Sequence, residues 1–333
     1  MQSEATALQE FPHHRREPCW PLVVIVGPTA SGKSELAIAL ARAFHGEIVN
    51  CDSVQVFRHF DIGTAKVPES ERCGIPHHLI DIAAPDELFT AGDYSRLGRK
   101  VLEDIRARGR LPLVAGGTGF YVRALLEGLF AGPARDEDLR HRLVERERAR
   151  PGFLHRFLRR ADPAAARRIH ENDKNKLIRA VEVCVLERRP LTGLLDYQKE
   201  PLKGYQALKI GLSPRRDALR QKIDERCRIM FERGLVEETR RILALGFAET
   251  CKPFQSLGYA QALRMVRGEW PPELALADLQ LRTRRYAKRQ WTWFRADPEI
   301  VWLDGFGHDG QVRQAAAAAI QSFLCRFENF QRS

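Results

Sequence analysis

The sequence predicts an α/β protein with a parallel β-sheet core and an inserted all-helical domain. Short apolar runs at Leu22–Val26, Ile48–Asn50 and Leu111–Ala115 are typical of buried strands. Helical patterns at Ser34–Phe44 and Phe120–Leu129 alternate with these runs, an order that favours parallel pairing. Ligands bind at the carboxyl ends of the strands in such sheets, so we expect the functional side chains there.

The domain organisation follows from a change of pattern. Residues 135–190 are rich in Arg, Glu and Ala at helical spacing and contain no strand-like run, whereas Leu208–Leu212 again resembles a strand. We therefore expect a core of residues 20–132 and 204–333, and a helical insertion of residues 133–203. Helices are expected over residues 215–295, with breaks near Gly246, Pro253 and Pro271-Pro272, followed by a last strand at Ile300–Leu303. Residues 1–19 are expected to be a disordered extension, because they lack the apolar stretch of a signal peptide.

The composition is that of a globular protein, with 44% hydrophobic and 29% charged residues among 333. The net charge of +11 favours a polyanionic partner, either nucleic acid or an anionic membrane surface. No run approaches the roughly 18 apolar residues of a membrane-spanning helix. None of the seven cysteines forms a CxxC pair, which favours reduced thiols and does not support a zinc site. His77 and His78 lack acidic partners at metal-ligand spacing, so we assign them a structural role.

A phosphate-binding loop follows the first expected strand. Its eight residues fit the pattern G-x-x-x-x-G-K-[ST] and are Gly27, Pro28, Thr29, Ala30, Ser31, Gly32, Lys33 and Ser34. The backbone N–H groups of such a loop and the helix N-terminus behind it attract phosphate oxygens. Lys33 adds a full positive charge, and the Ser34 hydroxyl is a candidate Mg²⁺ ligand. The motif predicts a P-loop NTPase-like core that binds a diphosphate or triphosphate, without identifying ATP.

An acidic residue, Asp52, closes the second expected strand. A carboxylate at this strand end faces the phosphate site. It can hold Mg²⁺ through water, as in nucleotide hydrolases, or act as a base toward an acceptor. A purely structural alternative, in which Asp52 caps the next helix, remains open at this point.

Several further segments carry a family signature. They are Asp52–Phe57, Asp61–Lys66, Gly74–Leu79, Phe89–Tyr94, Gly116–Tyr121, Ile169–Asp173, Arg179–Val183 and Thr283–Gln290. Together they resemble the tRNA dimethylallyltransferases, also called tRNA isopentenyltransferases, from about Val23 to Arg295. The chain departs from the family pattern at Glu171, Lys176 and Ala260, and Ala260 stands where a basic residue is frequent. It is similar to the bacterial type, because the C-terminal zinc finger of eukaryotic members has no counterpart in it.

The resemblance implies transfer of a dimethylallyl group from dimethylallyl diphosphate to N6 of an adenosine in tRNA. The expected target is the adenosine 3′-adjacent to the anticodon, position 37, in tRNAs that read codons starting with U. The resemblance assigns Asp52 as the base, Lys33 and the loop as diphosphate ligands with Mg²⁺ on Ser34, and Thr118 as a catalytic residue of the reaction channel. A hydroxyl that only stabilises a turn is the alternative for Thr118. The adenine must leave its stack to react, and Gln55 is expected to bind its edge.

Contacts with the tRNA anticodon stem-loop are expected from the strand ends, the insertion and the C-terminal helices. The segment Arg282–Arg295 carries six basic residues, no acid and four interleaved aromatics, which suits phosphate contacts and base stacking. A solvated basic helix with a buried aromatic face is the alternative. The expected contacts are Asp52, Ser53, Val54, Gln55, Thr118, Arg140, Asn175, Lys176, Leu177, Ile178, Arg179, Gln255, Ser256, Leu257, Gly258, Tyr259, Lys288, Arg289, Gln290, Trp291, Thr292, Trp293, Phe294 and Arg295.

Three other functions fit parts of the sequence. An adenylate isopentenyltransferase, which alkylates free AMP or ADP, would share the loop and Asp52, but the insertion and the basic segment favour a macromolecular acceptor. A small-molecule kinase would need a γ-phosphate site and an arginine-bearing lid. An RNA-binding module with a vestigial loop is disfavoured by the intact Lys33, Ser34 and Asp52. We expect a cytoplasmic, monomeric enzyme without a membrane partner or an obligate protein partner.

Overall fold

The computed structural model describes residues 19–130, 132–195 and 200–328. The expected disordered extension, residues 1–19, therefore lies outside the described residues except for Cys19. Residue contacts divide the described chain into two compact units. The first holds the residues up to Phe89, Leu97–Tyr121 and those from Lys203 onward, and the second holds Thr90–Arg96 and Val122–Leu202. The second unit thus begins earlier than the expected boundary at residue 133.

The first unit contains a six-stranded sheet in the order β3-β2-β4-β1-β5-β6, and every pairing is parallel. The strands are β1 (Trp20–Val26), β2 (Gly46–Asn50), β3 (His77–His78), β4 (Leu111–Ala115), β5 (Tyr205–Leu212) and β6 (Ile300–Leu303). The predicted α/β class and all five predicted strands are confirmed. The edge strand β3 was not predicted, because two residues give no periodicity.

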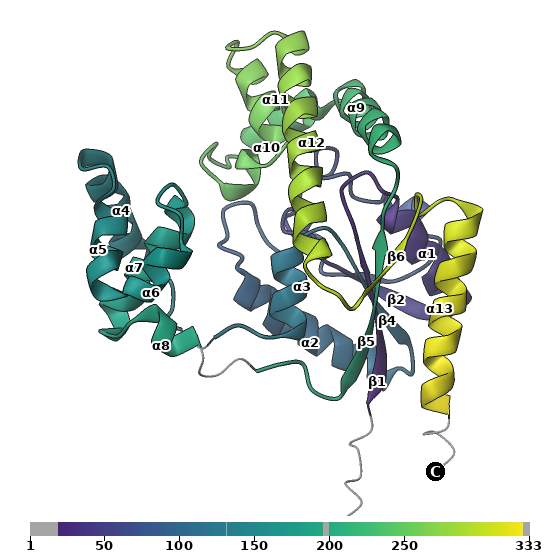
Figure 1. Cartoon of the computed structure of the whole chain (residues 1–333). Helices are drawn as coiled ribbons and strands as arrows, with labels where there is room; N and C mark the ends of the chain where they lie inside the picture. The colour runs from purple at the N-terminus through teal and green to yellow at the C-terminus, as the bar shows by residue number, and fades with distance from the viewer. Residues whose placement is uncertain (1–18, 131, 196–199, 329–333) are drawn as a thin grey trace, which may run out of the picture. The chain divides into compact units, whose positions relative to one another are not determined.

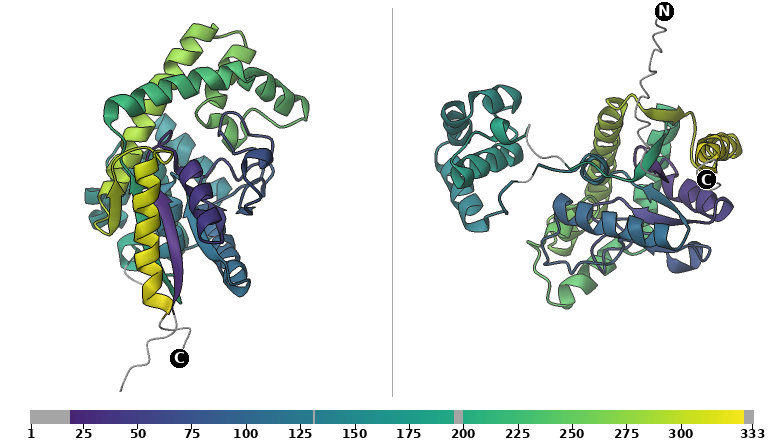
Figure 2. Two further views of the ribbon diagram at one scale, coloured as in Figure 1. Left: turned by 90° about the vertical axis from the view of Figure 1, so that its right-hand side faces the viewer. Right: turned by 90° about the horizontal axis from the view of Figure 1, so that it is seen from below.

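Alternating side chains of β1 bury both faces of the sheet. Val23 and Ile25 pack in one apolar cluster with α1 (Lys33–Ala43) and α13 (Gly310–Glu328). Figure 2 shows α13 in yellow running alongside β1 in purple. On the other face, Arg106 of α2 (Ala91–Ala107) lies 5.7 Å over the ring of Trp20. A parallel sheet buried on both faces requires the continuous apolar strands seen in the sequence.

The helices that follow β5 lie beyond the carboxyl ends of the strands (Figure 1). They are α9 (Arg216–Glu232), α10 (Leu235–Ala244), the 3₁₀ turn η2 (Lys252–Gln255), α11 (Tyr259–Val266) and α12 (Pro272–Arg295). The predicted breaks near Gly246, Pro253 and Pro271-Pro272 are confirmed by these bounds. Earlier in the chain, α3 (Gly119–Leu126) follows β4, and the 3₁₀ turn η1 (Glu69–Glu71) precedes β3.

The second unit is helical, as residues 135–190 predicted. Its helices are α4 (Glu137–Ala149), α5 (Phe153–Ala161), α6 (Pro163–Arg168), α7 (Lys174–Glu187) and α8 (Leu191–Leu195). Asp136, Asp162 and Asp173 each cap a following helix by accepting a backbone N–H. Leucine and alanine side chains from α4 to α8 form the unit's own apolar cluster.

Candidate active site

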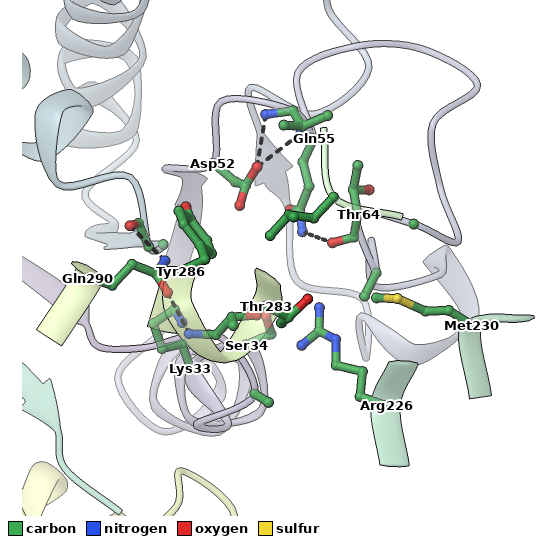
Figure 3. A pocket seen from close by; sticks show the side chains of 18 of the residues that line it. Lys33, Ser34, Asp52, Gln55, Thr64, Arg226, Met230, Thr283, Tyr286 and Gln290 are labelled. Carbon is green, nitrogen blue, oxygen red and sulfur yellow. Dashed lines mark hydrogen bonds between the residues drawn. The ribbon is translucent and has the colours of Figure 1, made fainter. Parts of the chain in front are cut away.

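A cavity of about 630 Å³ opens at the carboxyl ends of β1, β2 and β4, within the first unit. Its walls also include residues of α9 and α12 (Figure 3). The phosphate loop, Asp52 and the second glycine turn at Gly116-Gly117 all line it. The loop and Asp52, which the sequence predicts at the strand ends, thus line one cavity.

The phosphate loop has the backbone that its glycines predict. Gly32 adopts φ 86° directly before α1 begins at Lys33, and a Cβ at Gly32 would lie 2.7 Å from the backbone nitrogen of Gly307. That nitrogen donates a hydrogen bond to the Ser31 carbonyl at 2.9 Å, so a C-terminal segment holds the loop from outside. Of the eight loop residues, those that line the cavity are Thr29, Ala30, Gly32, Lys33 and Ser34.

Two cations face each other across this end of the cavity. Lys33 Nζ donates to the Pro28 carbonyl at 2.7 Å, and burial together with the neighbouring Arg226 lowers the Lys33 pKa to about 8. Arg226, on α9, forms no hydrogen bond or ion pair with a described residue, and burial also lowers its pKa. Its guanidinium points into the cavity beside Ser34 (Figure 3). Two close, half-buried positive charges without an ion pair to a described residue favour a multiply charged anion between them.

The two carboxylate oxygens of Asp52 have different surroundings. Oδ1 accepts the backbone N–H groups of Val54 at 2.8 Å and Gln55 at 3.3 Å. Oδ2 makes no hydrogen bond with a described residue, and Asp52 lines the cavity. The capping role and a role in the cavity are therefore compatible, because each uses a different oxygen.

Thr118 lies behind the cavity wall. Its Oγ1 accepts the Ser53 N–H at 3.1 Å, and its hydroxyl shares a hydrogen bond with Tyr286. Tyr286 itself lines the cavity, and burial and the nearby charge of Asp52 raise its pKa, so the phenol keeps its proton. Thr118 thus ties the Asp52 turn to α12, and the catalytic role that the resemblance implies for it stays a prediction.

One face of α12 forms a wall of the cavity. Leu279, Thr283, Tyr286 and Gln290 line it and recur every three or four residues, which places them on one side of the helix. Gln290 accepts the Thr29 N–H at 2.8 Å and donates to the Gly117 carbonyl at 2.8 Å, so its amide links the two glycine turns. The basic segment therefore supplies part of the cavity as well as a charged surface.

The other face of α12 is exposed and basic. Arg285 and Lys288 form no ion pair with a described residue, and neither does Arg289, which also lines the cavity. Arg284 pairs with Asp224 at 2.7 Å. Trp293 is exposed and Phe294 is 3% exposed. The burial of Phe294 fits the alternative of a buried aromatic face for that residue, and contact of the exposed charges and Trp293 with RNA stays a prediction.

Several residues expected to contact tRNA are covered by the protein itself. Their side chains or backbone are buried, and they are Leu177, Ile178, Gly258, Tyr259, Gln290 and Phe294. These positions are enclosed by the protein in this structure, and direct contact with tRNA stays a prediction for them. Among the other expected contacts, the exposed ones are Asn175, Lys176, Gln255, Lys288, Arg289, Thr292, Trp293 and Arg295, and the half-buried ones are Ser53, Val54, Gln55, Arg140, Arg179, Ser256, Leu257 and Trp291.

Arg140 and Arg179 share one buried carboxylate in the second unit. Glu182 is fully buried, accepts Arg140 Nη1 at 3.0 Å and Arg179 Nη1 at 2.7 Å, and also accepts the Asp136 N–H at 3.0 Å. Arg179 donates further to the Pro133 carbonyl at 3.0 Å. The two guanidinium groups are thereby held in fixed positions.

The histidines and cysteines have ordinary partners. His78 Nε2 lies 2.7 Å from Glu47, and His77 Nδ1 lies 2.8 Å from the Ile75 carbonyl. The residues that the structure describes contain no group of three or more His, Cys, Asp or Glu side chains able to hold a metal ion. Nor does any helix in those ranges have the length and apolar character needed to span a membrane.

Comparison with known proteins identifies the family. Residues 55–297 match the model of the family described as IPP transferase. The tRNA dimethylallyltransferase of Solibacter usitatus is 59% identical over 91% of this chain and 99% of its own, and that of Koribacter versatilis is 53% identical over 90% and 98%. The solved tRNA isopentenylpyrophosphate transferase of Bacillus halodurans is 36% identical, with a TM-score of 0.69 over 96% of this chain and all of its own.

A eukaryotic dimethylallyltransferase solved while acting on tRNA is 29% identical, with a TM-score of 0.76 over 92% of this chain and 80% of its own. The region that the family model matches begins at Gln55, just after Asp52. It includes Thr118, Arg226 and the cavity face of α12. The chain therefore belongs to the IPP transferase family of tRNA dimethylallyltransferases.

Proposed function

We propose that the protein transfers the dimethylallyl group of dimethylallyl diphosphate to N6 of adenosine 37 in tRNAs that read codons starting with U. As a family member it is a tRNA prenyltransferase. The observation that carries the finer proposal is the single cavity shared by the phosphate loop and the free oxygen of Asp52. The relatives reported above are named for tRNA, so they do not support an adenylate isopentenyltransferase or a kinase.

The donor diphosphate would lie between Lys33, Arg226 and the N-terminus of α1. Negative charge accumulates on the diphosphate as the allylic C–O bond breaks, and fixed cations and N–H groups stabilise that charge without reorganising. The Ser34 hydroxyl lines the cavity and has no partner among the described residues, which fits a ligand of Mg²⁺. Bound there, Mg²⁺ would neutralise diphosphate oxygens.

The acceptor adenine would lie on the Asp52 side of the cavity. N6 attacks the allylic carbon, the diphosphate leaves with the electron pair of the C–O bond, and one N6 proton passes to Asp52 Oδ2. The Thr118–Tyr286 hydrogen bond and the two N–H groups on Oδ1 hold the Asp52 turn in place. A base that is fixed in this way needs no rearrangement as the new bond forms.

The anticodon stem-loop would be bound through exposed basic groups. Lys288 and Arg289 on α12 and Lys176 on α7 are exposed, and Glu182 fixes Arg140 and Arg179. Such contacts position the loop, while unstacking the target base costs a few kcal/mol. A tRNA substrate favours a cytoplasmic enzyme, and action in the cytoplasm without a membrane or an obligate protein partner belongs to the same proposal.

The proposal is tested on tRNA that lacks the modification. After incubation with dimethylallyl diphosphate and Mg²⁺, the tRNA is digested and its nucleosides and fragments are analysed by mass spectrometry. We expect N6-(dimethylallyl)adenosine in the anticodon fragment that contains position 37. A prenylated adenosine elsewhere, or unmodified tRNA, would contradict the proposal.

Donor binding is expected to weaken as the pH rises through about 8. A lowered pKa means that Lys33 carries its charge below about 8 and loses it above, so affinity for inorganic diphosphate should fall by up to about tenfold between pH 8 and 9. Calorimetric titration across pH 7 to 9.5 measures this fall. Lys33→Arg stays charged across this range and should remove most of the pH dependence of diphosphate affinity. If the variant showed the same pH dependence as the wild type, titration of Lys33 would be excluded as the cause.

Lys288→Ala is expected to weaken tRNA binding and to reduce the salt slope of log K by about one unit. The reason is that an exposed lysine without an ion pair releases about one counterion when it meets a phosphate. Filter binding at several salt concentrations gives the slope. Arg42→Ala, at the exposed C-terminal end of α1, is the matched control and should leave it unchanged. Equal slopes for wild type and Lys288→Ala would exclude this contact.

A further inference from the structure

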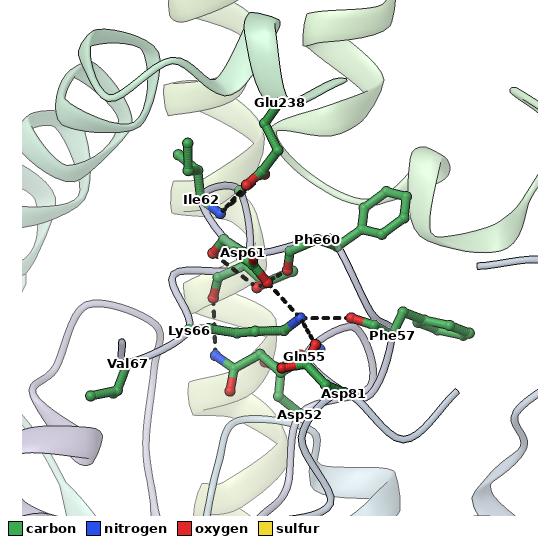
Figure 4. A network of polar contacts seen from close by, with 12 residues as sticks. Asp52, Gln55, Phe57, Phe60, Asp61, Ile62, Lys66, Val67, Asp81 and Glu238 are labelled. Atoms are coloured by element: carbon green, nitrogen blue, oxygen red, sulfur yellow. Dashed lines mark hydrogen bonds and ion pairs between the residues drawn. The ribbon is translucent and has the colours of Figure 1, made fainter. Parts of the chain in front are cut away.

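The segment Asp61–Lys66, here called the Asp61 loop, forms the part of the cavity wall next to Gln55. Gly63, Thr64 and Ala65 line the cavity. Gln55 Nε2 donates to the Thr64 carbonyl at 3.0 Å (Figure 4), so the loop fixes the direction of the Gln55 amide. With Nε2 held in this way, Oε1 is left as a hydrogen-bond acceptor at the cavity.

Two buried side chains from separate helices hold this loop. Glu238 of α10 is 2% exposed and accepts the Ile62 N–H with both oxygens at 3.1 Å. Tyr259 at the start of α11 is fully buried, donates its hydroxyl to Glu238 Oε1, and accepts the Gly63 N–H at 3.1 Å. Burial raises the pKa of both groups. The pair thus binds the backbone N–H groups of two consecutive loop residues.

The contact between the loop and Tyr259 leaves no space for adjustment. A Cβ at Gly63 would lie 2.4 Å from a ring carbon of Tyr259. The same ring packs edge-on against Phe60 at 4.6 Å, and Phe60 packs against Phe254 at 5.0 Å. The ring therefore sets how close the loop lies to α11, and its hydroxyl sets the position along the backbone.

The far end of the loop is fixed independently. Lys66, buried to 8% exposure, donates to the Phe57 carbonyl at 2.6 Å and to the carboxylates of Asp61 and Asp81. With both ends held, the Thr64 carbonyl has a defined position, and so does the amide that donates to it.

We propose that Glu238 and Tyr259 are positioning residues for the acceptor, which act through the Asp61 loop to direct Gln55 Oε1 at the N6 amino group of the adenine. This inference rests on the proposed function. Adenine presents an N–H donor at N6, which matches the free acceptor of Gln55. Neither residue touches tRNA, since both are enclosed by the protein.

Tyr259→Phe tests the inference, because it keeps the ring that Gly63 packs against and removes only the hydroxyl. We expect kcat/KM for tRNA to fall about tenfold while KM for dimethylallyl diphosphate stays within twofold, because loss of the two hydrogen bonds of the hydroxyl, to Glu238 and from Gly63 N–H, displaces the loop. In a protein that already carries Gln55→Ala, Tyr259→Phe should lower kcat/KM for tRNA less than twofold. The reason is that Tyr259 acts only through Gln55, so its effect disappears when Gln55 is absent. Glu238→Gln replaces one of the two oxygens that accept the Ile62 N–H by an NH2 donor, so it should show the same pattern and serves if Tyr259→Phe does not fold.

Thr239→Val is the matched control. It removes a buried hydroxyl of α10, next to Glu238 in the sequence, that donates to the Leu235 carbonyl at 2.8 Å, and it should leave the kcat/KM for tRNA unchanged. Two results would overturn the inference. One is a fall in kcat/KM for tRNA in the double variant that equals the product of the falls in the two single variants. The other is a KM for dimethylallyl diphosphate that rises as much as kcat/KM for tRNA falls. Failure of the proposed function itself would be seen separately, as absent transfer to tRNA by the wild type.

Discussion

Asp52→Asn is expected to lower kcat for tRNA prenylation by about 10²- to 10⁴-fold, the range that a positioned general base contributes. Asparagine keeps an oxygen that can accept the N–H groups of Val54 and Gln55, so the turn should persist. What it loses is the negative Oδ2, which faces the cavity without a protein partner. Single-turnover kinetics with saturating tRNA measure the chemical step.

The affinity for tRNA should stay within a few-fold of the wild-type value in this variant. Asp52→Ala serves as the comparison, because it removes the cap together with the base and should therefore add a loss of thermal stability. A kcat for Asp52→Asn within threefold of wild type would exclude Asp52 as the base.

Arg226→Gln is expected to reduce kcat/KM for dimethylallyl diphosphate by about 10²- to 10³-fold, as for loss of one preorganised donor to a developing anion. Arg226 points into the cavity, forms no hydrogen bond or ion pair within the described part of the chain, and lies close enough to Lys33 to lower the pKa of that lysine. Removing it should also move the Lys33 pKa back up. Steady-state kinetics with varied donor at fixed tRNA give the effect.

The control is Arg228→Gln on the same helix. Arg228 is exposed and pairs with Glu225 and Glu232, so its loss should leave kcat/KM for the donor within twofold. Equal effects of the two substitutions would show that only the general charge of α9 matters, and that Arg226 does not contact the diphosphate.

The residues at the ends of the strands could be predicted from the sequence, because apolar strands, glycine turns and an acidic residue after a strand are recognised from short segments. Each functional group of the β1, β2 and β4 ends follows its strand within a few residues, and a parallel sheet brings such ends together. The order of the strands and the partners of each turn depend on contacts between distant residues. The link from Gln290 to Thr29 and Gly117 is of that kind, since no spacing in the sequence indicates it.

Arg226 could have been found from helical periodicity. Leu219, Ile223, Arg226 and Met230 recur at intervals of three or four on α9, so a lone arginine interrupts an otherwise apolar stripe. A charged side chain in an apolar stripe needs an oppositely charged partner, and the residues that the structure describes provide none for Arg226. The segment Arg282–Arg295 contains a similar periodic pattern. Thr283 and Tyr286 are three residues apart and line the cavity, although basic residues surround them in the sequence.

Glu238 and Tyr259 had no comparable local signal. Glu238 lies in an ordinary amphipathic helix, where a glutamate predicts exposure. It is buried where it accepts the backbone N–H of Ile62 and the hydroxyl of Tyr259, and neither partner is near it in the sequence. Tyr259 was expected to contact RNA on the strength of its segment, and the fold instead places its ring beneath Gly63.

The most direct test of the central claim is one reaction mixture in which several acceptors compete. It contains labelled dimethylallyl diphosphate, Mg²⁺, tRNA that lacks the modification, AMP and ATP. The account predicts label on tRNA, release of one diphosphate for each group transferred, and no consumption of ATP. Label on AMP instead of tRNA, or hydrolysis of ATP without transfer, would contradict it.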